Sequence, residues 1–315
     1  MQNRGYGADS TARLRDPLER LLLVSQAPIV PHSHPIMPDT VRLAALSDIH
    51  YSKSSQGSMQ PLFTQVAESA DVMLVGGDLT DYGLAEEARI LAKDLAPVKI
   101  PVVAVLGNHD YESGEEREIS KILTDVGVHM LDGDTWEYHD VGFAGVRGFC
   151  GGFGRGALGP WGEKIIKDFV HEAVQEALKL ESALARLKSD HRIVLMHYSP
   201  IRATVEGEPP EIFPFLGSSR LEDPLSRFDV TAVFHGHAHK GAPEGRTQTG
   251  IPVFNVAHAV LERNYPDRPT FRVFEVHTGE RGEKGVTPIS DRRQHGRRAA
   301  DRDGSDAQVA NPSPS

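Results

Sequence analysis

Five short apolar runs along the chain each stop abruptly at a cluster of polar residues. The clearest run begins at Val102 and ends at Gly107-Asn108-His109-Asp110. An apolar run of this length that is bounded by glycine is typical of a buried, parallel strand. Open α/β sheets place their chemistry at the carboxyl ends of such strands. The other four runs end at Asp48 and His50, at Asp78 and Asp81, at His197, and at His235, His237 and His239.

Helical spacing of apolar residues separates the first strands. Because strands and helices alternate here, these strands should pack side by side as a parallel sheet. The predicted strands lie at 42–47, at 72–75 and from 102, and helices are predicted near 62–70 and over 84–96, 115–126 and 163–187.

The pattern changes after residue 126. Short strands over 128–131, 135–139 and 143–146 are separated by Asp-Gly or Val-Gly turns, which predicts an antiparallel meander. Four more strands, over 192–196, 230–234, 251–256 and 270–276, complete the sheets.

Two loops are long enough to carry function. Residues 148–162 contain seven glycines, but without the spacing of a phosphate-binding loop, so a flexible connector is the better interpretation. Arg155 in this loop is a candidate substrate contact. The stretch 199–220 is rich in proline and has no periodicity, which is typical of a lid or binding loop without regular structure.

Composition excludes several classes of protein. The net charge of −10 repels phosphate backbones and argues against a nucleic-acid partner. The lone cysteine, Cys150, excludes an internal disulfide and fits a reducing compartment. The chain shows neither a secretory signal nor an apolar span of about 20 residues, so we predict a cytoplasmic protein that does not enter a membrane. We expect a flexible leader over 1–40, one folded domain over 41–279 and a disordered tail over 280–315.

The polar clusters together offer only nitrogen and oxygen ligands. Imidazole and carboxylate groups suit Mn, Fe, Zn or Co ions, whereas a structural zinc site usually includes thiolates. Seven ligands are too many for one ion, but two ions that share a carboxylate would have four each. The candidate metal ligands are Asp48, His50, Asp78, Asn108, His197, His237 and His239.

The ordered blocks Asp48-x-His50, Gly77-Asp78-x-x-Asp81, Gly107-Asn108-His109-Asp110, His197 and Gly236-His237-x-His239 resemble the five motifs of the calcineurin-like metallophosphoesterase superfamily. The resemblance covers roughly residues 42 to 277 and leaves no ligand position unfilled. It implies an α/β fold, a four-layer α/β/β/α sandwich of two mixed β-sheets flanked by helices, with the site on loops at the strand ends.

The resemblance also implies a role for each residue. Asp48, His50, Asp78 and His239 would bind one of two divalent or trivalent metal ions, and Asp78, Asn108, His197 and His237 would bind the other, so that Asp78 bridges them. His109 would face the substrate phosphate as a general acid or charge stabiliser, and Asp81 would orient the ring of His109. Two such ions can hold a bridging hydroxide that attacks phosphorus.

These observations predict a metal-dependent phosphoesterase that hydrolyses a small phosphodiester or phosphomonoester. A nuclease of the same superfamily is the alternative, and the acidic charge argues against it. A non-catalytic scaffold with this fold is a third hypothesis, but a scaffold can lose ligand residues and none is lost here. One departure is informative, since Tyr82-Gly83 follows Asp81 where the protein serine/threonine phosphatases have Arg-Gly. The physiological substrate, the metals bound and the oligomeric state stay open.

Overall fold

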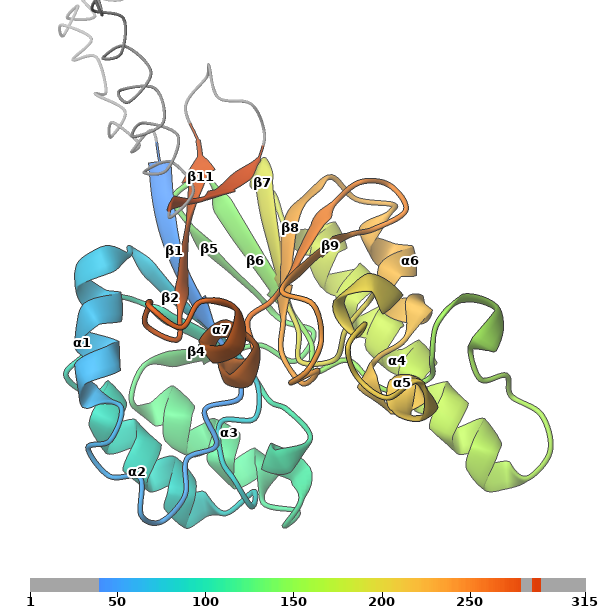
Figure 1. Ribbon diagram of the computed structural model, residues 1–315, viewed down its shortest axis with the longest axis horizontal. Coiled ribbons are helices and arrows are strands. Elements are labelled where there is room, and N and C mark those ends of the chain that lie inside the picture. Colours follow the sequence, from blue (N-terminus) through green and yellow to red (C-terminus); the bar gives the residue numbers. More distant parts are fainter. Residues whose placement is uncertain (1–39, 279–284, 290–315) are drawn as a thin grey trace, which may run out of the picture. The chain divides into compact units, whose positions relative to one another are not determined.

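Two six-stranded mixed sheets face each other in the computed structural model, which describes residues 40–278 and 285–289 (Figure 1). The predicted leader up to residue 39 and most of the predicted tail lie outside these residues. The strands of the first sheet are, in order, β12 (Val286–Pro288), β11 (Arg272–His277), β1 (Thr40–Leu46), β2 (Val72–Gly76), β3 (Val102–Val105) and β4 (Val128–Met130). Those of the second are β5 (Thr135–Tyr138), β6 (Val141–Gly145), β7 (His191–Leu195), β8 (Val230–His235), β10 (Pro252–Asn255) and β9 (Glu244–Arg246).

Each sheet has a block of parallel strands and at least one antiparallel edge. In the first sheet β1 to β4 run parallel, and β11 and β12 are antiparallel additions at one edge. In the second sheet β6, β7, β8 and β10 run parallel, and β5 and β9 are antiparallel. The carboxyl ends of the central strands therefore gather at one edge of each sheet.

Helices cover the outer face of each sheet (Figure 1). The first sheet packs against α1 (Gln60–Ser69), α2 (Ala85–Leu95) and α3 (Glu116–Asp125), and the second packs against α4 (Lys164–Arg186) and α6 (Glu222–Leu225). Two short helices, α5 (Phe213–Leu216) and α7 (His258–Asn264), belong to loops at the strand ends.

Alternation along the strands creates three apolar interfaces. In β1, Leu43 and Ala45 point between the sheets, whereas Ala44 and Leu46 point toward the helices. In β7, Ile193 points between the sheets and Val194 points toward α4. A side-chain period of two buries both faces of each central strand. The predicted four-layer α/β/β/α sandwich is confirmed.

The predicted antiparallel meander is wrong. β4 pairs in parallel with β3, in the first sheet, and the chain then crosses to the second sheet, where β5 and β6 form a hairpin. The turn at Asp132-Gly133, which signalled a hairpin in the sequence, is instead this crossing. Its geometry is set by contact with the second sheet, because Gly133 N–H donates to the carbonyl of Gly145 in β6 at 2.8 Å.

Residues 199–220 are more ordered than predicted. They contain 3₁₀ turns at Arg202–Thr204, Pro210–Ile212 and Ser219–Leu221 as well as α5. Pro210 and Pro214 lie in the first turns of their elements, where proline lacks no needed hydrogen bond, so prolines that suggested a loop begin short helices. Residues 286–288, within the stretch predicted as a tail, form β12 and pair with β11.

Candidate metal centre

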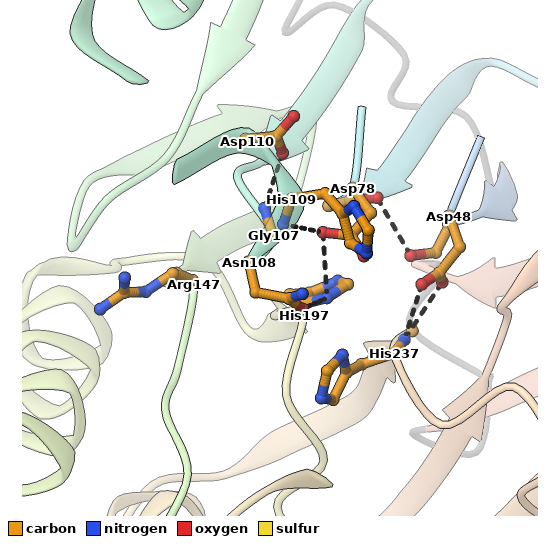
Figure 2. A network of polar contacts seen from close by, with 12 residues as sticks. Asp48, Asp78, Gly107, Asn108, His109, Asp110, Arg147, His197 and His237 are labelled. Carbon is orange, nitrogen blue, oxygen red and sulfur yellow. Dashed lines mark hydrogen bonds and ion pairs between the residues drawn. The ribbon is translucent and has the colours of Figure 1, made fainter. Parts of the chain in front are cut away.

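The five polar clusters converge where strands of both sheets end (Figure 2). Asp48 and His50 follow β1, Asp78 follows β2 and Asn108 follows β3; His197 follows β7, and His237 and His239 follow β8. Three groups of side chains have ligand atoms within 4.8 Å of one another: Asp48, His50 and His239; His50, Asp81 and His109; and Asp78, His197 and His237. The fold therefore brings every candidate histidine and carboxylate ligand into one region.

Left-handed backbone conformations aim several of these side chains. Asp48, His50, Asp78 and His237 have φ values of 58°, 43°, 47° and 67°. Such a conformation costs an L-residue roughly 1–3 kcal/mol and persists only where the surroundings hold it. Hydrogen bonds between the first two loops do so, since Asp48 N–H donates to the carbonyl of Gly77 and His50 N–H donates to the carbonyl of Asp78, both at 3.0 Å.

Two glycines allow the loops to approach the carboxylates. A Cβ atom at Gly107 would lie 2.2 Å from Oδ1 of Asp78, and one at Gly236 would lie 2.2 Å from Oδ2 of Asp48. Main-chain donors in the same loops then bind the carboxylates. His109 N–H donates to Asp78 Oδ1 at 2.9 Å, and His237 N–H donates to Asp48 Oδ1 at 3.0 Å. Any larger residue than glycine would push these loops away from the site.

Hydrogen bonds also fix which nitrogen of each histidine faces the centre. His197 Nδ1–H donates to the carbonyl of Gly76 at 2.9 Å, so its Nε2 faces Asn108 Oδ1 at 2.9 Å and Asp78 Oδ1 at 3.4 Å. His237 Nε2–H donates to the carbonyl of Phe215 in α5 at 3.0 Å, which leaves Nδ1 with a free lone pair. Such contacts set the tautomer that a metal ligand needs.

The imidazole of His50 lacks hydrogen-bond partners in the folded chain. Both of its ring nitrogens are buried without a hydrogen bond. The nearest carboxylate oxygens are Asp78 Oδ2, at 3.8 Å from Nε2, and Asp81 Oδ1, at 3.5 Å from Nδ1. Buried polar atoms are almost always satisfied in proteins, and a cation bound to the unprotonated ring nitrogen would satisfy one of the two.

The charges of the site depend on one another. Burial raises the pKa of Asp48, but the hydrogen bond with His239 and the charge of His197 outweigh burial and hold that pKa below its usual value. Burial also raises the pKa of Asp78, but the charge and hydrogen bond of His197 outweigh burial, and that pKa is lowered. In His197 burial lowers the pKa, but the charge of Asp78 and its hydrogen bond prevail and raise the pKa to about 9. Burial lowers the pKa of His237 to about 4.

Asp110, to which the sequence analysis gave no role, holds two of the loops together. Its side chain is fully buried. Oδ1 accepts the N–H and the hydroxyl of Thr80 at 2.8 and 2.6 Å, and Oδ2 accepts the N–H of Gly107 at 2.8 Å and of Leu79 at 3.2 Å. Asp110 therefore joins the loop of Asp78 to the loop of Asn108 (Figure 2). Its place in the Gly-Asn-His-Asp block was a signal that could have identified it.

The contact between His109 and Asp81 differs from the expected one. His109 Nδ1–H donates to the main-chain carbonyl of Asp81 at 2.7 Å, and the Asp81 carboxylate lies near His50 instead. The ring of His109 lies edge-on to that of His50, with centroids 4.7 Å apart. Orientation of His109 by Asp81 thus depends on the backbone of Asp81 and not on its side chain.

Two further residues take no part in these ligand groups. His235 is fully buried and its Nε2 lies 2.8 Å from the Thr204 hydroxyl, so a hydrogen bond holds its ring. Arg155 lies exposed in a 3₁₀ turn over Gly154–Gly156, and among the described residues it has no hydrogen bond or ion pair that links it to the site. Its predicted contact with substrate stays a prediction.

Comparison with known proteins identifies the family of this chain. A sequence profile described as "calcineurin-like phosphoesterase" matches residues 41–241. The chain belongs to this family. The calcineurin-like phosphoesterases are metal-dependent, and this member is accordingly a hydrolase that acts on phosphoester bonds.

Relatives within the family have related names. A probable cyclic nucleotide phosphodiesterase of Vesicomyosocius okutanii is 24% identical over 252 residues, which cover 75% of this chain and 93% of the relative. A probable glycerophosphodiester phosphodiesterase of Arcobacter nitrofigilis is 20% identical, over 54% of this chain and 57% of the relative. The crystal structure of a phosphopantetheinyl hydrolase from Mycobacterium tuberculosis superposes with a TM-score of 0.55 at 16% identity, over 76% of this chain and 97% of that one, which shows a common fold.

The site of this calcineurin-like phosphoesterase fits the divalent metals that its family uses. The donors are imidazole and carboxylate groups, which bind first-row transition ions, and the unpartnered nitrogens of His50 lie beside the carboxylates of Asp78 and Asp81. Across residues 40–278 and 285–289, no helix is both long enough and apolar enough to span a bilayer. The predicted cytoplasmic location stays a prediction.

Proposed function

We propose that this chain hydrolyses small phosphodiesters with two metal ions. Asp48, His50 and His239 would hold one ion, and Asn108, His197 and His237 would hold the other, with Asp78 between them. One observation carries this proposal. Ligand groups from both sheets meet around Asp78, whose Oδ1 lies 3.4 Å from His197 Nε2 and whose Oδ2 lies 3.8 Å from the unpartnered Nε2 of His50.

The ions, when bound, would activate a water molecule and offset the charge of the phosphate. The protein supplies the remaining parts. The hydrogen bond from His109 Nδ1–H to the Asp81 carbonyl fixes the ring, so that Nε2 is the nitrogen left to donate a proton to the leaving oxygen. Asp110 supports this step, because it joins the loops that carry Asp78 and His109.

The names of the relatives favour diesters over monoesters. Both relatives named above are probable phosphodiesterases, one of a cyclic nucleotide and one of a glycerophosphodiester. The net charge of −10 argues against a nuclease. A scaffold would not need ligands whose nitrogens are fixed by hydrogen bonds, as in His197 and His237. We therefore retain hydrolysis of a small diester as the function.

The direct test is metal reconstitution. The protein is stripped with a chelator, reloaded with Mn, Fe, Co or Zn, and assayed on bis(p-nitrophenyl) phosphate and on p-nitrophenyl phosphate. We expect hydrolysis only after reloading, with a higher kcat/KM for the diester. Activity that persists in the stripped protein would refute metal dependence, and a preference for the monoester would overturn the choice of a diester.

A further inference from the structure

A cavity of about 270 Å³ lies beside the candidate metal centre. One wall includes Leu106, which directly precedes Gly107, and Tyr111, which directly follows Asp110. The lining also includes Arg147, whose main-chain carbonyl accepts the N–H of His197 at 2.9 Å. The cavity, here called the Tyr111 pocket, therefore shares its walls with the segments that carry Asn108, His109 and His197. Figure 2 shows Arg147 on the Asn108 side of the site.

A larger cavity of about 620 Å³ lies elsewhere. It is lined by residues at the start of β8, such as Val230, and by β9 and β10. The candidate ligands follow the other end of β8, so this larger cavity is remote from the chemistry. The Tyr111 pocket, by contrast, adjoins the same carboxyl edge as the metal centre, and a diester bound there could extend into it.

Several polar groups of the Tyr111 pocket are unused within the described part of the chain. The hydroxyls of Tyr111 and Ser120, the Arg117 guanidinium and the Asp134 carboxylate line it, and none of these groups makes a hydrogen bond or ion pair with another described residue. Two hydroxyls, a guanidinium and a carboxylate offer both donors and acceptors. A ligand with several hydroxyl groups can use both.

The charge of the pocket disfavours an anionic group on the part of the ligand that enters it. The guanidinium of Arg147 is already paired with Glu172 at 2.7 Å and lies over the ring of Tyr111, with 4.4 Å between its central carbon and the ring centroid. The pocket also contains Asp134 and Glu116, against the single unpaired cation of Arg117 among its described lining residues. The surplus of carboxylates repels a phosphate or carboxylate group and tolerates a neutral one.

We propose that the Tyr111 pocket binds one alcohol arm of the phosphodiester and selects a small, uncharged arm with several hydroxyl groups, of the size of glycerol or a pentose. This inference rests on the proposed function. Tyr111 and Ser120 are the specificity-determining residues, because their hydroxyls would bind the arm, and Asp134 accounts for the exclusion of anionic arms.

The test compares three p-nitrophenyl phosphodiesters whose second arm is methyl, glyceryl or 2-carboxyethyl. Total turnover is measured from release of both alcohols by the metal-loaded protein. A neutral hydrogen bond is worth about two- to tenfold in an equilibrium, so two of them should favour the glyceryl over the methyl diester by about tenfold in kcat/KM. We expect the 2-carboxyethyl diester to be the poorest of the three.

Variants locate the preference. Ser120→Leu fills the pocket, and Tyr111→Phe removes only a hydroxyl, and each should reduce the glyceryl-to-methyl ratio of kcat/KM to about one- to threefold. Asp134→Asn should raise kcat/KM for the 2-carboxyethyl diester relative to the methyl one. Lys121→Ala is the matched control, because Lys121 is exposed on α3 next to Ser120 but does not line the pocket, and its ratios should equal those of the unmodified protein.

Each outcome has a distinct meaning. Equal kcat/KM for the methyl and glyceryl diesters, or a glyceryl preference that survives both Ser120→Leu and Tyr111→Phe, would overturn the pocket assignment while the proposed function stands. If Ser120→Leu fails to fold, Tyr111→Phe alone decides, since it adds no atoms. Failure of the metal-loaded protein to hydrolyse any of the three diesters would overturn the proposed function, and the pocket assignment with it.

Discussion

Replacement of Asp110 by alanine should destabilise the fold and disorder the metal centre at the same time. The substitution removes the acceptor of three main-chain N–H groups, those of Leu79, Thr80 and Gly107, and of the Thr80 hydroxyl. All of these donors are buried around a side chain with no exposed surface. Such donors have no access to water in the folded state.

The magnitude follows from those contacts. A buried donor without a partner costs roughly 1–3 kcal/mol, so three N–H groups would cost about 3–9 kcal/mol. The removed carboxylate was itself unfavourably placed, because burial raises the pKa of Asp110 to about 6 from an ordinary value of 3.8. That rise of about two pH units corresponds to roughly 3 kcal/mol that removal of the charge returns at neutral pH. The difference is a net loss of about 0–6 kcal/mol, with a midpoint of about 3 kcal/mol.

The assay is thermal unfolding in chelator, so that bound metal does not contribute. In a domain of this size 1 kcal/mol corresponds to roughly 2–4 °C in Tm, so the midpoint predicts a fall of about 6–12 °C. Thr80→Val is the matched control, because it removes only the hydroxyl that bonds Asp110, and it should lower Tm by a few degrees. A Tm for Asp110→Ala within 2 °C of the unmodified protein would refute this account of the two loops.

The remaining predictions concern single side chains of the centre. Asp78→Ala should reduce bound metal from two ions to fewer than one per chain, and an elemental analysis that still finds two would remove its bridging role. His109→Ala should lower kcat/KM by about 10² to 10⁴-fold on alkyl esters and much less on nitrophenyl esters, with metal content unchanged; equal losses would exclude a general acid. Asp81→Asn keeps the carbonyl that orients His109, so it should not alter this leaving-group dependence. It should weaken binding of the metal ion beside His50, which a titration of the stripped protein with metal would detect. The pKa of His197 is raised to about 9, so a metal must displace the proton of His197 when it binds below that pH. Metal affinity should therefore rise about tenfold per pH unit from pH 6 to 8 and level off above pH 9. Metal affinities measured by calorimetry that do not change with pH would contradict this.

The sequence predicted most of the layers because the central strands have a clear local pattern of apolar residues. The strand at Val102 is apolar on both faces and ends at glycine, and the structure buries all four residues of β3. The strand expected over 128–131 was given the wrong pairing partner for a physical reason. An Asp-Gly pair favours a tight turn, but only the contact of Gly133 with Gly145 decides that this turn leads to the other sheet. Pairing partners far apart in sequence leave no local signal.

The site likewise has parts that a local sequence pattern reveals and parts that it does not. Histidine, aspartate and asparagine side chains at strand ends could be found in the sequence because few residue types can bind a metal. The groups that orient them could not, since they are main-chain carbonyls: Asp81 for His109, Gly76 for His197 and Phe215 for His237. Every residue has a carbonyl, so residue type carries no information about which one accepts the hydrogen bond. The Phe215 carbonyl has a further consequence, because it belongs to α5 in the segment that was expected to be a structureless loop. If α5 moves, His237 loses the contact that fixes its tautomer, and the order of this segment is therefore part of the order of the metal centre.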